Sequence, residues 1–474
     1  MVNLFLEHYA PSIFVPLPSQ QRLYDLVVDH VDAVRAGCPV NQLLLLVHGG
    51  AGSGKSTMTS ALFQFITDNY CSTLAFKGAA TDYAAAVIGG VSLASSPHSS
   101  TIDCGQEYFL IDAANALDVA ILSNLSTQLN DMHHTPSAIF GGKNVILFAD
   151  FFQTPPQANR YNAIWCPHEV HDAIIQPFLS NVFWLKPEPI HLLPDSSITD
   201  KIRLNRLVDQ DFLRLNSHIV KPSDFVSTHA NEKFAVITTS SVRCKRLNME
   251  LPIHVANALN TTIYMLNATD TISFSVGGTM SIADLTFLKD NVANCGDIPG
   301  KMAVYIGMPC SVIIDSTPVW GVVFDIELDS REDVELPRPT LVHLTYPPTK
   351  LTVKVAEEVL LHNVDLKPFL HLKPVRRRYD WFMDNDDAEL GYVVRLQVPI
   401  APRLAIVEKE CEGQLFDHLL LDTQHGLQSL RSLYLVASRV PNINLLSVTH
   451  KVQHSSDVGW LLSLRETMLR LLYL

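Results

Sequence analysis

The sequence predicts an α/β fold built on parallel sheets, with a ligand bound at one sheet edge. Short apolar segments of strand character alternate with helical segments through the early part of the chain. Several of these strands end in a polar residue, and because parallel strands end at a common edge, their side chains meet there. The chain has 474 residues, of which 47% are apolar, so roughly two to four domains with sizeable cores are expected.

The first of these strands, residues 43–47, leads into a glycine-rich loop, and a helix follows from Met58. The loop has the pattern Gly-x4-Gly-Lys-Ser, which is that of a phosphate-binding P-loop. Its glycines let backbone N–H groups turn inward around phosphates, and the start of the helix adds partial positive charge. Lys55 supplies a full charge, and Ser56 offers a hydroxyl to magnesium. The nucleotide-binding residues predicted here are Gly49, Gly50, Ala51, Gly52, Ser53, Gly54, Lys55, Ser56 and Thr57.

The strands that follow the loop end in residues suited to hold a metal ion. Segments 72–76, 108–112 and 144–150 have the apolar composition of buried strands. Asp112 closes the second of them, and in P-loop enzymes a carboxylate at this position holds the magnesium ion. We therefore predict Ser56 and Asp112 as metal ligands. A helix cap or a turn residue is the alternative for Asp112.

Charge and cysteine usage limit the classes of partner. The net charge is −13, so no global basic field attracts nucleic acid or membrane. Nucleic-acid contact would rely on local patches such as 243–246 and 376–381, for which a solvated face is the alternative. The eight cysteines are scattered without a C-x-x-C pair, which is typical of reduced thiols in an intracellular protein. The sequence shows no secretory signal and no apolar run approaching ~20 residues.

Further segments, in a fixed order along the chain, carry a family resemblance. Gln21 stands near the start of the first expected helix, and residues 79–90 form a small-residue turn and helix. Residues 140–156 read Phe-Gly-Gly, an apolar strand, and then Asp150-Phe-Phe-Gln153-Thr-Pro-Pro. This order resembles the Pif-type (petite integration frequency) family of superfamily-one DNA helicases, which includes the helicase half of Helitron transposons. In that family a glutamine precedes the first helix, at the position that Gln21 matches.

The resemblance continues through the C-terminal half, to about residue 448. Arg206 looks like the arginine of the segment that opens the family's second motor domain, and Arg203 competes for that role. Residues 304–309 match a segment that enters a small β-rich insertion. Residues 433–440 are similar to the family's final arginine motif.

The resemblance implies two RecA-like P-loop NTPase domains with ATP in the cleft between them, and a small β-rich (SH3-like) insertion in the second. The implied bounds are 1–194 for the first domain, 195–300 and 396–474 for the two parts of the second, and 301–395 for the insertion. Strands of the second domain are expected at 234–238, 262–266 and 418–422. The last segment, 458–474, reads as an amphipathic helix packed on the core. The chain is expected to be a piece of a longer gene, because it begins just before Gln21 without an accessory domain.

The implied activity is that of an ATP-dependent DNA helicase, which couples ATP hydrolysis to single-stranded DNA translocation and duplex unwinding. ATP and Mg²⁺ are the implied cofactors. The implied partner is single-stranded DNA or a DNA fork, and not a membrane. A monomeric nuclear protein of DNA repair, recombination, telomere maintenance or transposition is expected.

The resemblance also assigns roles to single residues. Lys55 holds the phosphates, Gln153 senses the γ-phosphate, and Arg439 reaches across the cleft as an arginine finger. A surface arginine is the alternative for Arg439. The implied nucleotide-binding residues beyond the P-loop are Gln21, Asp112, Asp150, Arg206 and Gly413.

Several residues depart from the family pattern. Ala113 stands where the family has its water-activating glutamate, and loss of a general base commonly costs about 10²–10⁴ in rate. Asp118 lies beyond the strand end and is a poor substitute. Glu410 and Glu412 stand where the family has a lysine and a glutamine, which makes a contact with phosphates or DNA repulsive. The smaller departures, at a proline, a glycine and a histidine of the family, are Ala80, Asp82 and Ala94.

These observations leave three hypotheses of different classes. The ordered motifs favour an ATP-driven DNA helicase. Ala113, Glu410 and Glu412 favour a degenerate homologue with little or no hydrolysis, which acts as a nucleotide- or DNA-binding module or survives as a transposon relic. An unrelated P-loop enzyme such as a kinase is the third hypothesis. Residues 150–156 and the C-terminal Ser438-Arg439 argue against it.

Overall fold

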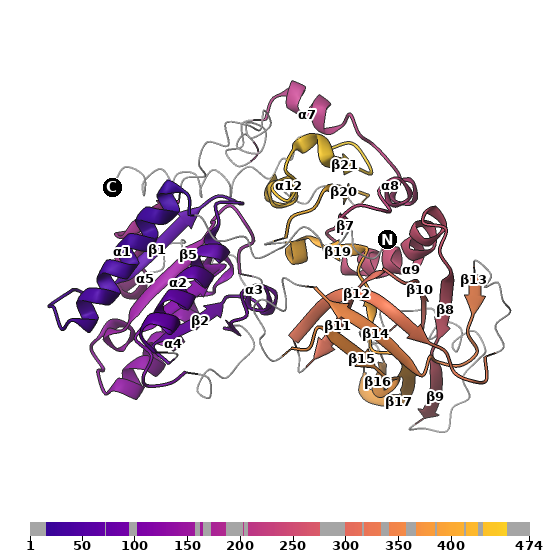
Figure 1. Ribbon diagram of the computed structural model, residues 1–474, viewed down its shortest axis with the longest axis horizontal. Coiled ribbons are helices and arrows are strands. Elements are labelled where there is room, and N and C mark those ends of the chain that lie inside the picture. Colours follow the sequence, from indigo (N-terminus) through magenta and orange to yellow (C-terminus); the bar gives the residue numbers. More distant parts are fainter. Residues whose placement is uncertain are drawn as a thin grey trace.

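The computed structural model contains two parallel α/β sheets and a β-rich part in which most strand pairs are antiparallel (Figure 1). Figure 1 shows the two α/β parts side by side, with the β-rich part next to the second. The residues that the structure describes are 16–71, 73–93, 102–156, 162–164, 172–185, 202, 207–274, 299–314, 317–332, 341–356, 366–383, 386–411, 414–424 and 430–452.

The first sheet is six-stranded and parallel, with the order β3-β2-β4-β5-β1-β6. Its strands β1, β4 and β5 are buried along their whole length, because helices cover both faces. The strands are β1 (Leu44–Gly49), β2 (Ala75–Ala79), β3 (Val91–Ser92), β4 (Tyr108–Asp112), β5 (Asn144–Ala149) and β6 (Val182–Leu185). The helices are α1 (Pro18–Arg35), α2 (Lys55–Asn69), α3 (Asp82–Ile88), α4 (Val119–His133) and α5 (Asp172–Leu179).

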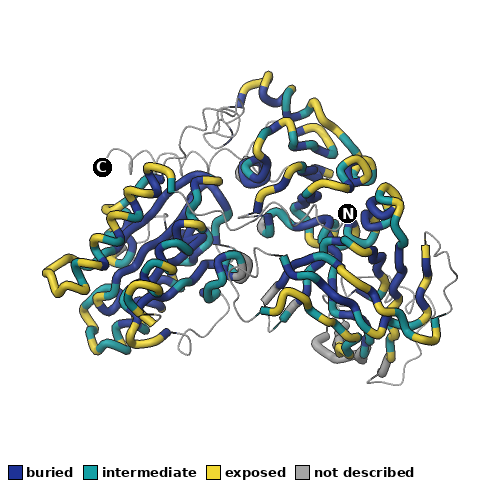
Figure 2. The backbone as a smooth tube through the Cα atoms, viewed as in Figure 1, coloured by how far each residue is buried: buried dark blue, intermediate teal, exposed yellow. Residues whose placement is uncertain are grey.

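Alternate residues of each central strand face the two helical layers. Leu45 and Val47 of β1 pack with the apolar faces of α1 and α2, whereas Leu44 and Leu46 pack in the cluster that contains the apolar face of α4. This period of two is the one that a pleated strand imposes. Figure 2 shows the result, with the central strands dark blue and the outward sides of the helices yellow.

The second sheet is four-stranded and parallel, with the order β19-β7-β20-β21. It joins strands that precede the β-rich part to strands that follow it. The strands are β7 (Phe234–Thr238), β19 (Ala405–Val407), β20 (His418–Asp422) and β21 (Leu446–Val448). The helices are α7 (Asp209–Leu215), α8 (Pro222–Thr228), α9 (Ser241–Ala258) and α12 (Leu430–Ala437). One buried apolar cluster contains Leu147 of the first sheet and Leu421 of the second, so the two α/β parts share a core.

The β-rich part forms three small sheets. A five-stranded antiparallel sheet has the order β15-β14-β12-β11-β18, and the others have the orders β16-β17-β9 and β10-β8-β13. The strands are β8 (Ile263–Asn267), β9 (Thr269–Phe274), β10 (Lys301–Val304), β11 (Pro309–Ile314), β12 (Thr317–Glu327), β13 (Leu341–His343), β14 (Lys350–Val355), β15 (Phe369–Leu372), β16 (Val375–Met383), β17 (Asp386–Gln397) and β18 (Ala401–Pro402). Short 3₁₀ helices are η2 (Ala114–Ala116), η3 (Ile139–Gly142), η6 (Glu408–Cys411) and η7 (Ile443–Leu445).

One predicted strand of the second domain lies outside the parallel sheet of β7 and β20. The sequence predicts a strand at 262–266, and β8 forms there. It pairs with β10 and β13. A short apolar run indicates a strand but carries no information on its partner.

Two further expectations concern the cysteines and the membrane. Among the described residues Cys38, Cys71, Cys104, Cys244, Cys310 and Cys411 are free thiols, in keeping with the expected absence of a disulfide framework. No helix in the described part of the chain combines the length and apolarity that crossing a bilayer requires.

Candidate nucleotide site

The P-loop lies between β1 and α2, as the sequence predicts. β1 ends at Gly49, and α2 begins at Lys55 after a residue in left-handed backbone conformation, Gly54, with φ 79°. The left-handed conformation favours glycine at this position, and a Cβ atom at Gly54 would also collide with the Gln20 side-chain amide. The helix N-terminus and the loop N–H groups therefore gather at the carboxyl edge of the sheet, where they suit a phosphate.

Lys55 lies folded over the loop. Its Nζ donates hydrogen bonds to the carbonyl oxygens of Gly49 at 2.9 Å and Gly50 at 3.0 Å. The ammonium is thereby held beside the turn that a phosphate chain would follow, in the position that the sequence assigns to it.

The two predicted metal ligands meet. Asp112, at the end of β4, is 4% exposed, and the Ser56 hydroxyl donates a hydrogen bond to its carboxylate. Burial raises the pKa of Asp112, and the hydrogen bonds from Ser56 and the Ala113 N–H together with the charge of Lys55 oppose that rise. A hydroxyl and a carboxylate are oxygen donors of the type that Mg²⁺ prefers, so the residues present fit that ion.

Residues of the second α/β part reach into the same site. Arg439, just after α12, donates from Nη2 to Oε1 of Gln153 at 3.2 Å, and Gln153 donates from Nε2 to Oδ2 of Asp150 at 2.9 Å. Arg439 is 5% exposed. The alternative of a surface arginine is therefore wrong for the described structure, and Arg439 lies across the cleft from the P-loop.

Tyr434 on α12 makes a second link across the cleft, which the sequence interpretation missed. Its hydroxyl accepts a hydrogen bond from the Ala51 N–H of the P-loop at 3.0 Å and donates one to Oδ2 of Asp150 at 3.0 Å. Asp150 is fully buried. One tyrosine thus joins the P-loop, the end of β5 and the second domain.

These elements enclose a cavity of about 250 Å³. Most of the cavity wall consists of the P-loop and of residues that follow β4 and β5. Leu415 and Arg439 come from the second domain. The lining residues are Ala51, Gly52, Gly54, Lys55, Ser56, Thr57, Ala84, Val87, Asp112, Ala113, Asn115, Gln153, Leu415 and Arg439. Of these, Asp112 is the sole carboxylate.

Ala113 lines this cavity where the resemblance places a glutamate. Its backbone is left-handed, with φ 52°, a conformation uncommon for a residue with a Cβ. The nearby Asp118 caps α4: its Oδ1 accepts from the Ala120 N–H at 2.8 Å, and its Oδ2 accepts from Asn162. Asp118 is therefore committed to the helix start and does not replace the missing base.

The structure places Gln20, and not the predicted Gln21, against the P-loop. Gln21 is exposed on α1 and donates to Asp25 Oδ1 at 2.7 Å. Gln20 is the buried neighbour: its Oε1 accepts from the Leu17 N–H at 2.9 Å, and its Nε2 donates to the Ser53 carbonyl at 3.0 Å. Gln20 shares a helix face with the core residue Leu23, so helical spacing was the signal that would have found it.

A matched pair of substitutions tests this placement. Gln20→Ala is expected to lower the free energy of unfolding by about 1–3 kcal/mol, because it leaves a P-loop carbonyl and the helix-entry N–H without their partner. Gln21→Ala should change it by less than about 0.5 kcal/mol, as exposed substitutions usually do. Urea denaturation of both variants measures the difference, and equal effects would contradict the placement of Gln20.

Removal of the Tyr434 hydroxyl tests the cross-cleft link. Tyr434→Phe is expected to lower the free energy of unfolding by about 1–3 kcal/mol, because the buried Asp150 carboxylate and the Ala51 N–H each lose a partner while the ring keeps its packing. Tyr24→Phe, which removes the hydroxyl of a partly buried tyrosine on α1, is the control. A Tyr434→Phe midpoint equal to that of the control would show that the link contributes nothing.

Several predicted residues lie outside the described part of the chain. They are Arg206 and Gly413, together with Arg203, Glu412, Ala94 and the segment 458–474. Glu410 is described, is partly buried in η6, and acts electrostatically on the Cys244 thiol of α9. It is not among the residues that line the cavity.

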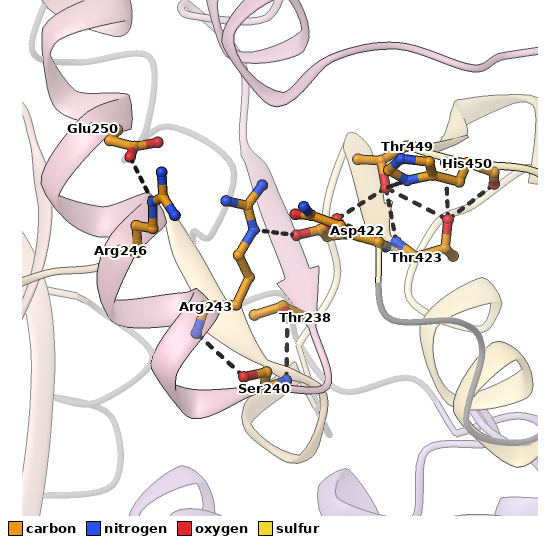
Figure 3. Close-up of polar contacts among 10 residues, drawn as sticks. Thr238, Ser240, Arg243, Arg246, Glu250, Asp422, Thr423, Thr449 and His450 are labelled. Atoms are coloured by element: carbon orange, nitrogen blue, oxygen red, sulfur yellow. Dashed lines mark hydrogen bonds and ion pairs between the residues drawn. The ribbon is translucent and has the colours of Figure 1, made fainter. Parts of the chain in front are cut away.

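The basic patch 243–246 is largely engaged within the chain (Figure 3). Arg243 pairs with the buried Asp422 at 2.8 Å, and Arg246 pairs with Glu250 at 2.9 Å. Asp422 also accepts from the Thr449 hydroxyl at 2.9 Å. A buried polar network therefore engages Arg243, whereas the Arg246–Glu250 pair lies at the surface. In the other patch the arginines at 376–378 are exposed on β16, and the side chains at 379–381 lie outside the description.

Comparison with known proteins gives a likeness of fold. No protein-family model matches the chain, and no curated protein sequence gives a significant match. A Pif1 helicase from Candida albicans superposes with a TM-score of 0.61 at 16% identity, over 97% of this chain and 100% of that one. The fold is that of the Pif1 helicases.

Two further structures agree. A Pif1 helicase from Bacteroides in complex with ADP-AlF3 and single-stranded DNA gives a TM-score of 0.57 at 15% identity, over 96% of this chain and 98% of that one. A structure that describes DNA unwinding at forked double-stranded DNA by two coordinating Pif1 helicases gives the same TM-score, identity and coverage. The predicted fold class, two RecA-like domains with a β-rich insertion, is confirmed. At these identities the likeness concerns the fold alone.

Proposed function

We propose that this chain is an ATP-dependent DNA helicase of the Pif1 type in which Ala113 slows hydrolysis. The observation that carries the proposal is the meeting of Lys55, Asp112, Gln153 and Arg439 around one cavity between two α/β domains. In a kinase or another single-domain P-loop enzyme, a contact like that of Arg439 with Gln153 has no function. In a two-domain motor it does have one, because it couples the state of the nucleotide to the separation of the domains.

The residues have distinct roles in this proposal. The P-loop N–H groups and Lys55 bind the β- and γ-phosphates. Ser56 and Asp112 would hold Mg²⁺, which when bound neutralises charge that develops on the phosphates. Arg439 stabilises the charge of the transferred phosphoryl group, and Gln153 links it to the end of β5. Loss of the γ-phosphate removes a group that Arg439 contacts and so weakens the attachment of the second domain to the first. The second domain is then free to move.

Single-stranded DNA is the proposed track. Neighbouring Pif1 structures hold single-stranded DNA, and the exposed arginines at 376–378 offer positive charge on a chain whose net charge is −13. Binding through so local a patch is salt-dependent. The proposed setting is nuclear DNA repair, recombination or transposition.

A nucleotide-gated binding module is the second candidate, and Ala113 favours it. The methyl group of Ala113 cannot accept a proton or orient water. Asp112, the one carboxylate among the described residues that line the cavity, is assigned to the metal ion. In this candidate ATP binding closes the cleft through Arg439 and Tyr434, but the chain turns over little or no ATP.

Steady-state ATP hydrolysis with and without single-stranded DNA distinguishes the two. DNA-stimulated turnover by the full chain, abolished by Lys55→Ala, would support the helicase, and strand-displacement assays would follow. Nucleotide binding with turnover no higher than that of Lys55→Ala would exclude the helicase and leave the binding module.

A further inference from the structure

A cluster of metal-ligating residue types lies on the second α/β domain, outside the nucleotide cavity. His229 is the C-cap residue of α8, Glu232 lies in the turn before β7, and His418 is the first residue of β20. Their ligand atoms all lie within 4.8 Å of one another. The fold therefore brings together two imidazoles and one carboxylate from segments far apart in the sequence.

The geometry of this trio is compact. Nδ1 of His229 and Nε2 of His418 each lie 2.8 Å from the same carboxylate oxygen, Oε2 of Glu232. The two imidazole rings stack with centroids 3.8 Å apart and planes at 21°. The ring of Phe225 packs against His229, with centroids 4.8 Å apart. One nitrogen of each imidazole thus lies beside the same carboxylate oxygen, and the rings pack against each other and against Phe225.

The backbone beside the trio is also fixed. The Lys233 N–H donates to Oδ2 of Asp417 at 3.1 Å, and the Asp417 N–H donates to the Lys233 carbonyl at 2.8 Å. These bonds tie the residue after Glu232 to the residue before His418. The backbone that carries Glu232 and His418 is therefore held together on both sides, which favours a defined position for a metal ligand set.

The arrangement of the trio favours a bound cation over protonation of both histidines. Two imidazolium rings stacked face to face would repel each other. The neutral imidazole is the form that binds metals.

We propose that His229, Glu232 and His418 bind one divalent transition-metal ion, for which Zn²⁺ is the best match. Two imidazoles and a carboxylate with an open fourth position is a known Zn²⁺ ligand set. Tetrahedral bonds of about 2.0–2.2 Å place ligand atoms about 3.3–3.6 Å apart, so each imidazole nitrogen, now 2.8 Å from the Glu232 carboxylate oxygen, would have to move apart from that oxygen by less than about 1 Å. The side chains of His229, His418 and Glu232 are 19%, 23% and 45% exposed, which leaves room for water as the fourth ligand.

The position of the site connects it to the nucleotide cavity. Leu415 lines that cavity, and the Phe416 N–H donates to the Arg439 carbonyl at 2.9 Å. His418 lies two residues further along the same segment. A bound ion would fix the start of β20 and hence the segment that carries these contacts. The inference itself does not depend on the proposed helicase activity.

Titration of the full chain with Co²⁺ and Zn²⁺ tests the proposal. Co²⁺ should give the visible d–d bands of a tetrahedral ion with nitrogen and oxygen ligands. The thiolate charge-transfer band that a cysteine site would add should be missing. Zn²⁺ should displace the bound Co²⁺ and abolish the d–d bands. His418→Ala and Glu232→Gln should each weaken Zn²⁺ binding by at least about 10- to 100-fold. That is the cost of losing a residue that only supports a metal ligand, and loss of a direct ligand should cost at least as much. His343→Ala, an exposed histidine on β13, should not change it.

Two results would overturn the proposal. One is a wild-type chain that shows no nitrogen- and oxygen-ligated Co²⁺ spectrum, which would make the trio a hydrogen-bonded cluster only. The other is Zn²⁺ affinity in Glu232→Gln equal to that of His343→Ala. Because Glu232 is partly exposed, this variant is informative even if His418→Ala fails to fold.

Discussion

Ala113→Glu is expected to raise ATP turnover by about 10²–10⁴, the contribution that a positioned general base commonly makes. Ala113 directly follows the predicted metal ligand Asp112 and lines the cavity. Its Cβ is already accommodated in the left-handed backbone at φ 52°, so glutamate adds no new backbone strain beyond that of alanine. The added carboxylate would extend into the cavity, where it can accept a proton from water.

Ala113→Gln is the matched control, because it has the same size but cannot act as a base. Steady-state phosphate release from the wild type and the two variants, at saturating ATP and with single-stranded DNA, measures the effect. Nearly equal rates for Ala113→Glu and Ala113→Gln would mean that the missing base does not limit turnover. In that case the low rate would have to come from elsewhere in the cleft.

The parts of the site that were predictable are those with short-range sequence signals. The P-loop has a fixed spacing of glycines before Lys55, and a buried apolar strand precedes Asp112. Such signals define both the element and its edge in the sheet. The structure accordingly places Lys55, Ser56 and Asp112 together at the carboxyl edge of the first sheet.

Features that depend on exact helical phase or on distant pairing were harder to predict. Gln20 and Gln21 are adjacent, and only the rotation of α1 against its sheet decides which of them meets the P-loop. The strand at β8 was predictable, but its partners β10 and β13 were not, because an apolar run carries no pairing information. Sequence-based interpretation therefore located elements better than it located their contacts.

Tyr434 illustrates the same limit at the centre of the site. It lies in the buried part of α12, where the sequence alone predicts that an aromatic residue contributes to core packing. Its hydroxyl instead bonds groups that are far away in the sequence, Ala51 and Asp150. The patch 243–246 shows the converse, because the charges that made it look like a nucleic-acid contact are paired with Asp422 and Glu250. Both outcomes depend on tertiary structure that no local pattern specifies.

Arg439→Ala is expected to lower DNA-stimulated ATP turnover by about 10³–10⁵, the range that arginine fingers contribute to phosphoryl transfer. Arg439 lines the cavity and reaches Gln153 across the cleft. No other cationic side chain from the second domain is among the described residues of that lining. The loss should appear in kcat, because the charge that an arginine finger stabilises develops in the transition state.

The measurement is best made in the Ala113→Glu background, where turnover is fast enough for a large loss to be seen. Arg246→Ala is the matched control: Arg246 lies on α9, is mostly exposed and pairs with Glu250, so its loss should leave kcat unchanged. Arg439→Lys should recover only part of the rate, because an ammonium lacks the planar fork of donors that can contact a phosphoryl group and Gln153 together. A kcat for Arg439→Ala within a few-fold of the control would mean that the contact with Gln153 is structural, and the coupling of the two domains to the nucleotide would then rest on Tyr434.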